Sequence, residues 1–366
     1  MQPAAIENQT RFPCGQCGAK LDFKPGAESL SCPYCGYVNA IEASAEHVVE
    51  QDFRETLRAL EAAAPREEHL RVKCDACAAE IDRPPNVTSL QCPFCGSNIV
   101  AQAACQTHIK PQGVLPFKVT KAEAMAGLRQ WVAKLWFAPG ALKAQMQTDA
   151  GVKGIYLPYW TYDAKTTTKY RGQRGDAYYV NESYTTVVNG KTVRQTRRVR
   201  KVRWSARSGV VHNTFDDVLV NASHSLPRQF VEKLEPWDLK NVVDYKDEYL
   251  SGFSAESYQI DLSEGFAAAQ QRMQPTIHAT ICADIGGDEQ RVDWMSVHHD
   301  AITFKHLLLP VWLLAYRFKS KAYRTFVNAR TGEVQGERPY SWGKISVAII
   351  GLIVVVAILV LLLAQR

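Results

Sequence analysis

The sequence predicts a multidomain fold: two small cysteine-rich units, an α+β domain rich in β-strands, and one C-terminal transmembrane helix. Three observations lead to this prediction. Eight of the ten cysteines form two matched quartets near the N-terminus, strand and hairpin patterns dominate the central part, and the chain ends in a long uncharged stretch. The predicted segments are 12–40 and 71–102 for the cysteine-rich units, 41–70 for a helical linker, 108–343 for the α+β domain and 345–364 for the transmembrane helix.

Each cysteine-rich unit contains two CxxC pairs separated by fourteen residues, and the second unit repeats the first at an offset of sixty. A repeat of this length indicates two copies of one small unit. Two CxxC turns joined by a short hairpin place four sulfurs around a divalent ion at about 2.3 Å from each. The predicted ligands are Cys14, Cys17, Cys32 and Cys35 in the first unit, and Cys74, Cys77, Cys92 and Cys95 in the second.

Zinc is the predicted ion, one in each unit, with a structural role. Four thiolates leave no open coordination position for water or a substrate. A unit of this size has almost no core, so metal ligation must supply much of its folding free energy. A disulfide framework is disfavoured because no cleavable signal peptide is recognisable. An iron centre is the other alternative, and nothing in the sequence favours it. Gly36, directly after the last cysteine of the first unit, is expected to have a positive φ.

The stretch Ile345–Ala364 contains no charged or strongly polar residue. A helix of this length rises about 30 Å, which matches the hydrocarbon core of a bilayer. Trp342 and Tyr340 precede it, where interfacial aromatic residues belong, and basic residues are more frequent before it than after it. This bias places the N-terminal part in the cytoplasm, where thiols stay reduced and can hold zinc.

Two helices are expected before the strand-rich region. Apolar residues at helical spacing in 41–70 (Val49, Phe53, Leu57 and Leu60) predict a helix that begins near Ser44 and ends before Pro65. It is either a packed spacer or a partner-binding helix. The second begins at Thr120 with a capping box and buries Met125, Leu128, Val132 and Leu135, with Trp131 and Trp136 as core aromatics.

Residues 151–220 are predicted to be rich in strands, with Asn189-Gly190 as the turn of a hairpin. The returning strand is strongly basic. It could be a solvated edge strand that deters aggregation, a contact surface for anionic lipid or an acidic protein, or a nucleic-acid contact. The candidate anion-binding residues are Arg194, Arg197, Arg198, Arg200, Lys201 and Arg203. Further along, a helix is expected over 262–273, with strands at 277–285, 301–304 and 307–318. The LPxW motifs at Leu157 and Leu309 hint at a duplicated half-domain.

No catalytic constellation is recognisable, so the sequence predicts a protein that is not an enzyme. Gly190-Lys191-Thr192 resembles the end of a phosphate loop, but Thr185 stands where the first glycine is required. His298-His299-Asp300 could bind a metal, although neighbouring residues of a strand point to opposite faces. The formal charge of +6 is also a weak argument for nucleic acid, because two zinc ions with eight thiolates would lower it to +2.

The order of motifs resembles a bacterial family of membrane-anchored zinc-ribbon proteins. The resemblance is carried by the two ribbons, the YLPYW and LLPVW strands, and TGEVQGERPYS (Thr331–Ser341) beside the apolar stretch. Members are labelled as rubredoxin-like, TFIIB-type zinc-ribbon proteins, or as primosomal protein N′ (replication factor Y) helicases. The helicase label does not suit this chain, since it has neither a phosphate loop nor a helicase motor.

Similar proteins are encoded beside phage-shock-protein-A-type (ESCRT-III-like) and SPFH/band-7 proteins. The resemblance therefore implies a tail-anchored adaptor in the bacterial cytoplasmic membrane, with its N-terminal domains in the cytoplasm, that recruits such peripheral proteins during envelope stress. The alternative is a membrane-tethered regulator that binds nucleic acid through the ribbons and the basic hairpin.

Overall fold

The structure is a computed structural model of the whole chain. It describes residues 12–27, 29–41, 48–62, 71–73, 80–82, 87–91, 98–100, 109–136, 139, 152–188, 191–224, 227–318, 321–338 and 340–364.

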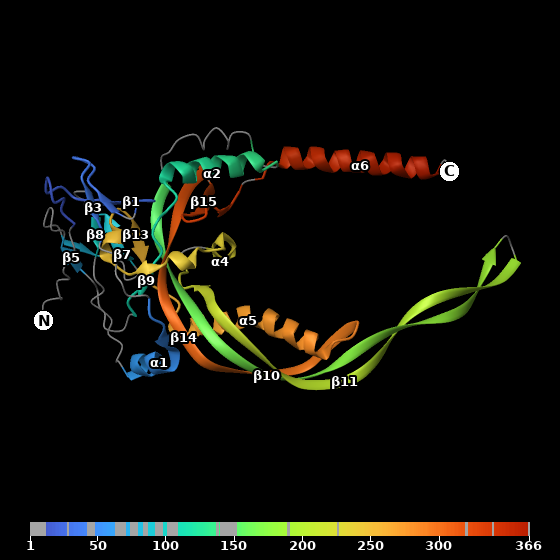
Figure 1. Cartoon of the computed structure of the whole chain (residues 1–366). Helices are drawn as coiled ribbons and strands as arrows, with labels where there is room; N and C mark the ends of the chain where they lie inside the picture. Colours follow the sequence, from blue (N-terminus) through green and yellow to red (C-terminus); the bar gives the residue numbers. More distant parts are fainter. Residues whose placement is uncertain are drawn as a thin grey trace.

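One long, curved and mostly antiparallel sheet forms the centre of the molecule (Figure 1). Strand β10 (Val152–Val188) pairs with β11 (Lys191–Asn221) and with β14 (Glu289–Phe318). Strands β15 (Lys321–Asn328) and β16 (Val334–Gly336) continue the sheet beyond β14. The expected hairpin is confirmed, because β10 and β11 pair as far as Val188 and Lys191; the turn residues 189 and 190 themselves lie outside the described residues.

The sheet bends where β10 passes Asp163. The register of β10 shifts against β11 between Tyr162 and Ala164, and against β14 between Asp163 and Lys165. On the two neighbouring strands, Asp217 and Ala301 have positive φ values of 49° and 47°. An extra residue in one strand of a pair kinks and twists the ladder locally. Bulges on both sides of β10 at one level therefore account for the change of direction there.

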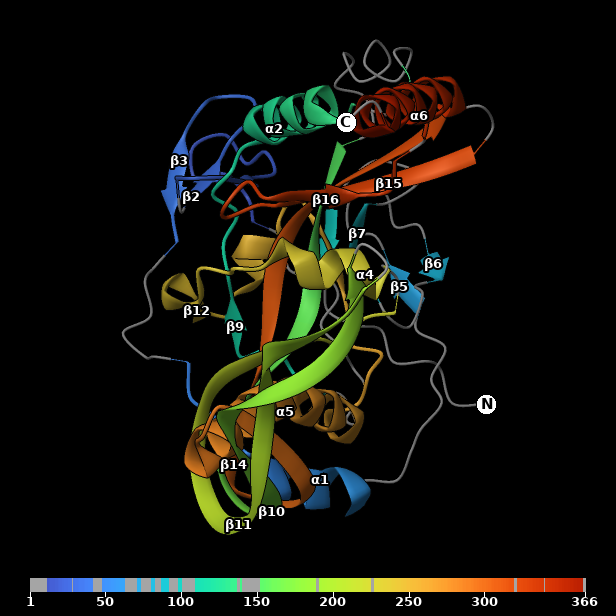
Figure 2. The same cartoon turned by 90° about the vertical axis from the view of Figure 1, so that its right-hand side faces the viewer.

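Helix α5 (Leu262–Ile285) covers one face of the bent sheet, and α1 lies beside it (Figure 2). This helix corrects the expectation of a helix over 262–273 followed by a strand over 277–285. Ile277, Ile281 and Ile285 are all buried and follow at intervals of four, so they form one helical stripe against the sheet. Burial of that stripe outweighs the strand preference of isoleucine and the presence of Pro275.

The two LPxW motifs lie directly opposite each other in the sheet. Leu157 on β10 pairs with Leu309 on β14 in antiparallel register. Trp160 belongs to the apolar cluster under α5 and Trp312 to the cluster near α2, and by the pairing register both side chains lie on the same face of the sheet. Every antiparallel pair of strands has such a local two-fold relation, so the hint of a duplicated half-domain stays a prediction.

Both predicted N-terminal helices are present, but only the second begins where it was predicted to begin. Helix α1 (Phe53–Ala62) begins at Phe53 rather than near Ser44, because Asp52 caps it through the amide of Glu55 at 2.8 Å. The preceding residues form β4 (Gln51–Asp52), which pairs with β14, and Val49, in the non-helical segment before β4, is 73% exposed. The parts of the predicted helix over 42–47 and 63–70 lie outside the described residues.

Helix α2 (Lys121–Lys134) has the predicted capping box between Thr120 and Glu123. Its predicted buried face is confirmed for Met125, Leu128 and Val132, while Leu135 is the partly buried C-cap residue. Trp136 is 77% exposed instead of buried, since the helix has ended before it and the side chain points away from the core. Helix α6 (Trp342–Ala364), at the C-terminus of the chain, starts close in space to the end of α2 (Figure 1).

Short elements complete the fold. They are β1 (Asp22–Lys24), β2 (Ser29–Ser31), β3 (Val38–Ala40), β5 (Arg71–Lys73), β6 (Glu80–Asp82), β7 (Val87–Gln91), β8 (Asn98–Val100), β9 (Gly113–Val114), α4 (Arg228–Val231), η1 (Glu232–Leu234), η2 (Leu239–Asn241), β12 (Val243–Asp244), η3 (Asp247–Leu250) and β13 (Ser254–Glu256). Strand β7 pairs with β13 and so joins the large sheet, whereas β1, β2 and β3 form a small sheet of their own.

Candidate metal centre

The first cysteine quartet forms a compact cluster of four sulfurs. The Sγ atoms of Cys14, Cys17, Cys32 and Cys35 all lie within 4.8 Å of one another. The Cys14–Cys35 and Cys17–Cys32 distances between Sγ atoms are 3.6 and 3.5 Å. Four sulfurs at about 2.3 Å from a tetrahedral zinc ion lie about 3.8 Å apart, so these spacings fit the ion closely.

Two turns of the same design present these sulfurs. In each, a glycine after the second cysteine of the pair donates its amide hydrogen to the carbonyl of the first cysteine: Gly18 to Cys14 at 2.9 Å, and Gly36 to Cys32 at 3.0 Å. The φ values of Gly18 and Gly36 are 70° and 73°, a conformation that side chains with a Cβ resist. The positive φ predicted for Gly36 is therefore confirmed, and Gly18 repeats it.

Backbone amides also point at the sulfurs. The amide of Gln16 lies 3.4 Å from the Cys14 Sγ, and that of Cys35 lies 3.5 Å from the Cys32 Sγ. The bond from the Cys35 amide lowers the pKa of the Cys32 thiol to about 6, although burial opposes the ionisation. At Cys35 the amide of Tyr37 favours the thiolate, but burial and the neighbouring sulfurs raise the pKa of this thiol to about 12.

The opposite pKa shifts of Cys32 and Cys35 indicate that the cluster requires a cation. One thiol loses its proton easily, while the accumulation of negative charge prevents four thiolates from coexisting without a cation. A divalent ion among the sulfurs would remove that repulsion, and N–H···S bonds would stabilise the bound thiolates. The donor set therefore fits one zinc ion in a structural role.

The first ribbon packs against the α+β domain. Leu21, Phe23 and Leu30 belong to the same apolar cluster as Phe253 and Leu308 of the domain. The Ser251 hydroxyl donates to the carbonyl of Leu21 at 2.7 Å, and the amide of Phe23 donates to the carbonyl of Ser251 at 3.1 Å. The ribbon is thus fixed to the domain by both hydrogen bonds and shared core.

The ligands predicted for the second ribbon, Cys74, Cys77, Cys92 and Cys95, lie outside the described residues, as does Cys105. Around them, β5 pairs with β6 and β7 pairs with β8. The Ser89 hydroxyl on β7 donates to the carbonyl of Phe253 at 2.6 Å. Strand β7, which lies between the cysteines, therefore attaches to the segment that also binds the first ribbon. The described residues show one cysteine cluster.

The basic residues predicted on the hairpin are all exposed on β11 and point alternately to two faces. Arg197 and Lys201 lie 3.8 and 2.7 Å from the carboxylate of Glu182, and Arg200 forms an ion pair with Glu289. His298 and His299 also separate as expected: His298 is exposed beside Asp300 at 3.0 Å, whereas the ring of His299 packs edge-on against another aromatic ring.

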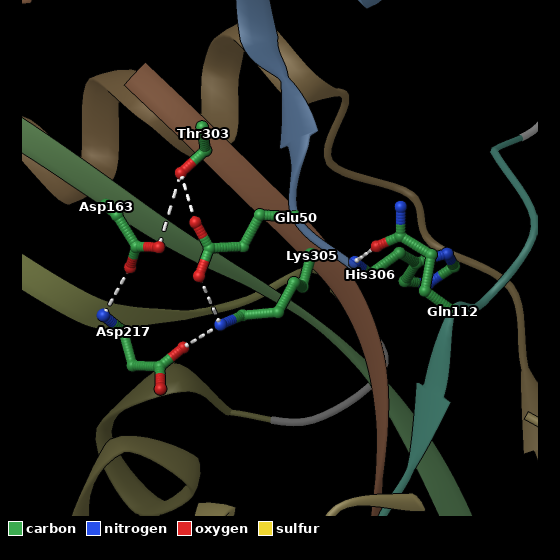
Figure 3. Close-up of polar contacts among 7 residues, drawn as sticks. All are labelled: Glu50, Gln112, Asp163, Asp217, Thr303, Lys305 and His306. Atoms are coloured by element: carbon green, nitrogen blue, oxygen red, sulfur yellow. Dashed lines mark hydrogen bonds and ion pairs between the residues drawn. The ribbon is translucent and has the colours of Figure 1, made fainter. Parts of the chain in front are cut away.

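A polar cluster at the bend of the sheet was not predicted from the sequence (Figure 3). Glu50, which precedes β4, accepts bonds from the Thr303 hydroxyl at 2.8 Å and the Lys305 ammonium at 3.1 Å. The same ammonium lies 2.8 Å from the Asp217 carboxylate, and the Asp217 amide donates to Asp163 at 2.6 Å. A lysine thus supplies the cation for this acidic group. Such a cluster is invisible in the sequence because its members come from four distant segments.

Burial, together with the nearby Glu50 carboxylate, raises the pKa of Asp163 to about 6. At Glu50 burial acts in the same direction, but bonds from Asp163, Thr303 and Lys305 outweigh it and lower the pKa of this carboxyl. The two carboxyls therefore hold one proton between them at mildly acidic pH, with Asp163 as its carrier.

Helix α6 is long and apolar enough to cross a membrane, and its residues are not buried against the described parts of the chain. Near its start, the Lys344 ammonium donates a bond to the carbonyl of Trp136 at 3.3 Å. An apolar helix with no protein partner along its length is expected to lie in lipid.

The described residues thus define a protein with a four-cysteine cluster, a β-rich domain built on a curled sheet, and a C-terminal apolar helix that is a candidate membrane anchor. Over 336 residues, which are 92% of both chains, it is 23% identical to "Uncharacterized protein YdjG" of Bacillus subtilis (strain 168). No family model and no solved structure matches the chain. This relation is a distant homology that spans nearly the whole length.

Proposed function

We propose that this protein is a membrane-anchored adaptor that is not an enzyme and that recruits peripheral proteins to the cytoplasmic face of the bacterial cytoplasmic membrane. Helix α6 would hold it in the bilayer, and the zinc-braced ribbon would contact the partner. By the resemblance of the motifs, the partners would be phage-shock-protein-A-type (ESCRT-III-like) or SPFH/band-7 proteins, and the setting envelope stress.

The observation that carries this proposal is the exposed apolar surface of the first ribbon. Tyr34, at the tip of its second metal-binding turn, is 83% exposed, with Val38 at 57% and Tyr37 at 46% nearby. These side chains lie on or directly after the turn that presents Cys32 and Cys35, and a zinc ion bound by the four cysteines would hold this backbone rigidly. Grouped exposed aromatic and aliphatic residues on a rigid surface are typical of protein–protein contacts. We name Tyr34, Tyr37 and Val38 the knuckle patch.

The test uses the full chain in bacterial cells together with a fluorescent phage-shock-protein-A-type protein. The parent chain is expected to move the fluorescence to the membrane. In the knuckle patch, the variant Tyr34→Ser/Val38→Ser is expected to lose at least about 90% of this recruitment, because central aromatic contacts often contribute about 2 kcal/mol or more to binding. The matched control Val49→Ser removes an equally exposed apolar side chain elsewhere and should recruit normally.

Normal recruitment by the Tyr34→Ser/Val38→Ser variant, with zinc content and membrane location retained, would contradict a role of the first ribbon as the binding surface. An SPFH-type protein labelled in the same way distinguishes the two partner classes. If neither protein responds to the parent chain, the adaptor proposal fails for both.

A further inference from the structure

The β10–β11 hairpin extends beyond the rest of the sheet as an isolated two-stranded arm (Figure 1). Strand β14 accompanies β10 only as far as the pair Gly175–Glu289. Residues 176–188 and 191–203, here called the arm, therefore pair only with each other within the described part of the chain. Two strands without a third bury little, and Tyr178, Tyr179 and Tyr184 are 39%, 54% and 39% exposed. Such an extension calls for a binding partner.

The pairing register assigns each charged side chain of the arm to one of two faces, since residues directly opposite each other share a face. The first face, called face A, carries Arg194, Arg198 and Arg200, opposite Thr185, Asn181 and Tyr179. The second, called face B, carries Arg197, Lys201 and Arg203, opposite Glu182, Tyr178 and Asp176.

The two faces differ in how their charges are compensated. Both acidic residues of the arm lie on face B, where Glu182 is within 3.8 Å of Arg197 and 2.7 Å of Lys201. Face A has no acidic residue of its own, and only Arg200 reaches one, Glu289 at the base. Among the described residues Arg194 and Arg198 form no ion pair; the guanidinium of Arg198 stacks on Tyr179 at 4.2 Å. Face A therefore retains uncompensated positive charge beside an exposed aromatic ring.

The position of α6 brings a bilayer within reach of this arm. Tyr340, two residues before α6, and Trp136, at the end of α2, are 54% and 77% exposed. They lie at the start of the apolar helix, as interfacial aromatic residues do. The arm and α6 extend from the domain toward the same side of the molecule (Figure 1). The arm runs alongside α6 (Figure 1), so when α6 is inserted the arm must turn at its base toward the headgroups, because a ribbon with this many guanidinium groups cannot enter hydrocarbon.

We propose that face A of the arm binds the anionic headgroups of the bilayer that holds α6, through Arg194 and Arg198 with Tyr179 at the interface. Guanidinium groups form paired hydrogen bonds with phosphate oxygens, and a tyrosine ring suits the headgroup layer. A membrane is favoured over nucleic acid because the anchor keeps it permanently beside the arm, which raises its effective concentration. This inference rests on the anchoring by α6 and is independent of whether the ribbon recruits a partner.

The test measures amide hydrogen exchange of residues 178–202 in the full zinc-loaded chain, embedded in lipid nanodiscs. In discs with about one third phosphatidylglycerol, exchange of the arm is expected to be about tenfold slower than in pure phosphatidylcholine discs, since each basic residue near an anionic surface adds to the attraction. High salt should abolish the difference.

Two double variants with the same loss of charge provide the decisive comparison. Arg194→Gln/Arg198→Gln, on face A, is expected to lose the slowing by anionic lipid. Arg197→Gln/Lys201→Gln, on face B, should keep it. Equal exchange in neutral discs for all three chains would show that the arm remains folded. Equal loss in both variants would mean that only net charge acts, and no slowing in the parent would overturn the proposal outright.

A mixed-sequence DNA duplex, added to the parent in neutral discs, tests the other polyanion. If the duplex slows exchange of the arm as much as anionic lipid does, through the same two arginines, the arm is a nucleic-acid contact and the lipid proposal is wrong. Slowing of exchange without any recruitment in cells would remove only the adaptor proposal. Failure of the parent chain to enter discs would remove the anchor, and both proposals with it.

Discussion

The four cysteines of the first ribbon show how closely residue chemistry constrains this molecule. Their spacing alone led to the four-cysteine cluster that the structure shows, and the CPxCG pattern led to the positive φ of Gly36. Both conclusions depend on local geometry, which a short sequence contains in full. The polar cluster of Asp163 and Lys305 could not be inferred, because it depends on how two bulges align three strands.

Loss of one ligand should empty the first metal site. Cys14→Ser is expected to lower the zinc content by one ion per chain and to destabilise the ribbon by several kcal/mol, because three thiolates then lack their fourth partner. Inductively coupled plasma mass spectrometry of the purified protein would measure the zinc. Cys282→Ser, a thiol remote from the cluster, is the control and should leave the content unchanged.

The raised pKa of Asp163 gives stability a defined dependence on pH. The folded chain binds a proton at Asp163 up to about pH 6, whereas the unfolded chain releases it near 3.8. Between these values the folded state holds more protons, so this group's contribution to the free energy of unfolding falls as pH rises. Glu50, whose pKa is lowered, acts in the opposite direction below its ordinary range.

Asp163→Asn should remove the contribution of Asp163. The amide resembles the protonated acid, so parent and variant should have similar stability at about pH 4. At about pH 7 the variant should be more stable by about 1 kcal/mol, a value reduced for solvent screening. Urea unfolding at both pH values would measure this. A variant less stable than the parent at neutral pH would show that the ionised carboxylate is needed there.

For helices and strands, the sequence predicted an element correctly where one local signal was clear, and failed where helix and strand preferences competed. Thr120 and Glu123 fixed the start of α2, because a capping box is a local arrangement. The second half of α5 reads as a strand because isoleucine is β-branched, and only packing against the sheet makes it helical. The sequence predicted strands over 151–220 but did not show that β10 is one continuous strand over Val152–Val188, since exposed strands beyond the core have no apolar alternation to reveal them.

The capping box yields a prediction for α2. Thr120→Ala removes the side-chain acceptor of the Glu123 amide and should lower the free energy of unfolding by about 1 kcal/mol. Thermal unfolding followed by circular dichroism would detect it. Lys121→Ala, next to the cap but exposed, should have less than half this effect; an equal effect would indicate that the cap contributes nothing particular.

For the whole molecule, the apolar C-terminus and the cysteine-rich N-terminus were both evident from composition. Their spatial relation was not, because the ribbon joins the domain through Phe23 and Ser251, which are 228 residues apart in the sequence. Contacts of that separation leave no trace in one sequence. The second ribbon's metal site remains a prediction from its repeat.

A chain that ends at Ser341 tests the anchor. The full protein is expected in the membrane fraction of cells, resistant to carbonate extraction, because transfer of α6 into water exposes about twenty apolar residues. The shortened chain should move to the soluble fraction while keeping its zinc. If it stayed with the membrane in full, α6 would not be the main attachment.

Because Phe23 shares a core with Phe253, a zinc ion bound by the first ribbon would support more than its own small fold. Loss of the metal would remove the packing of Phe23 against the domain's aromatic residues, so the domain core would be destabilised as well as the ribbon. Chelation should therefore shift the melting of the domain itself. Oxidants that attack the thiolates would act through the same contact, because oxidation of the cysteines at the surface would lower the stability of the domain core.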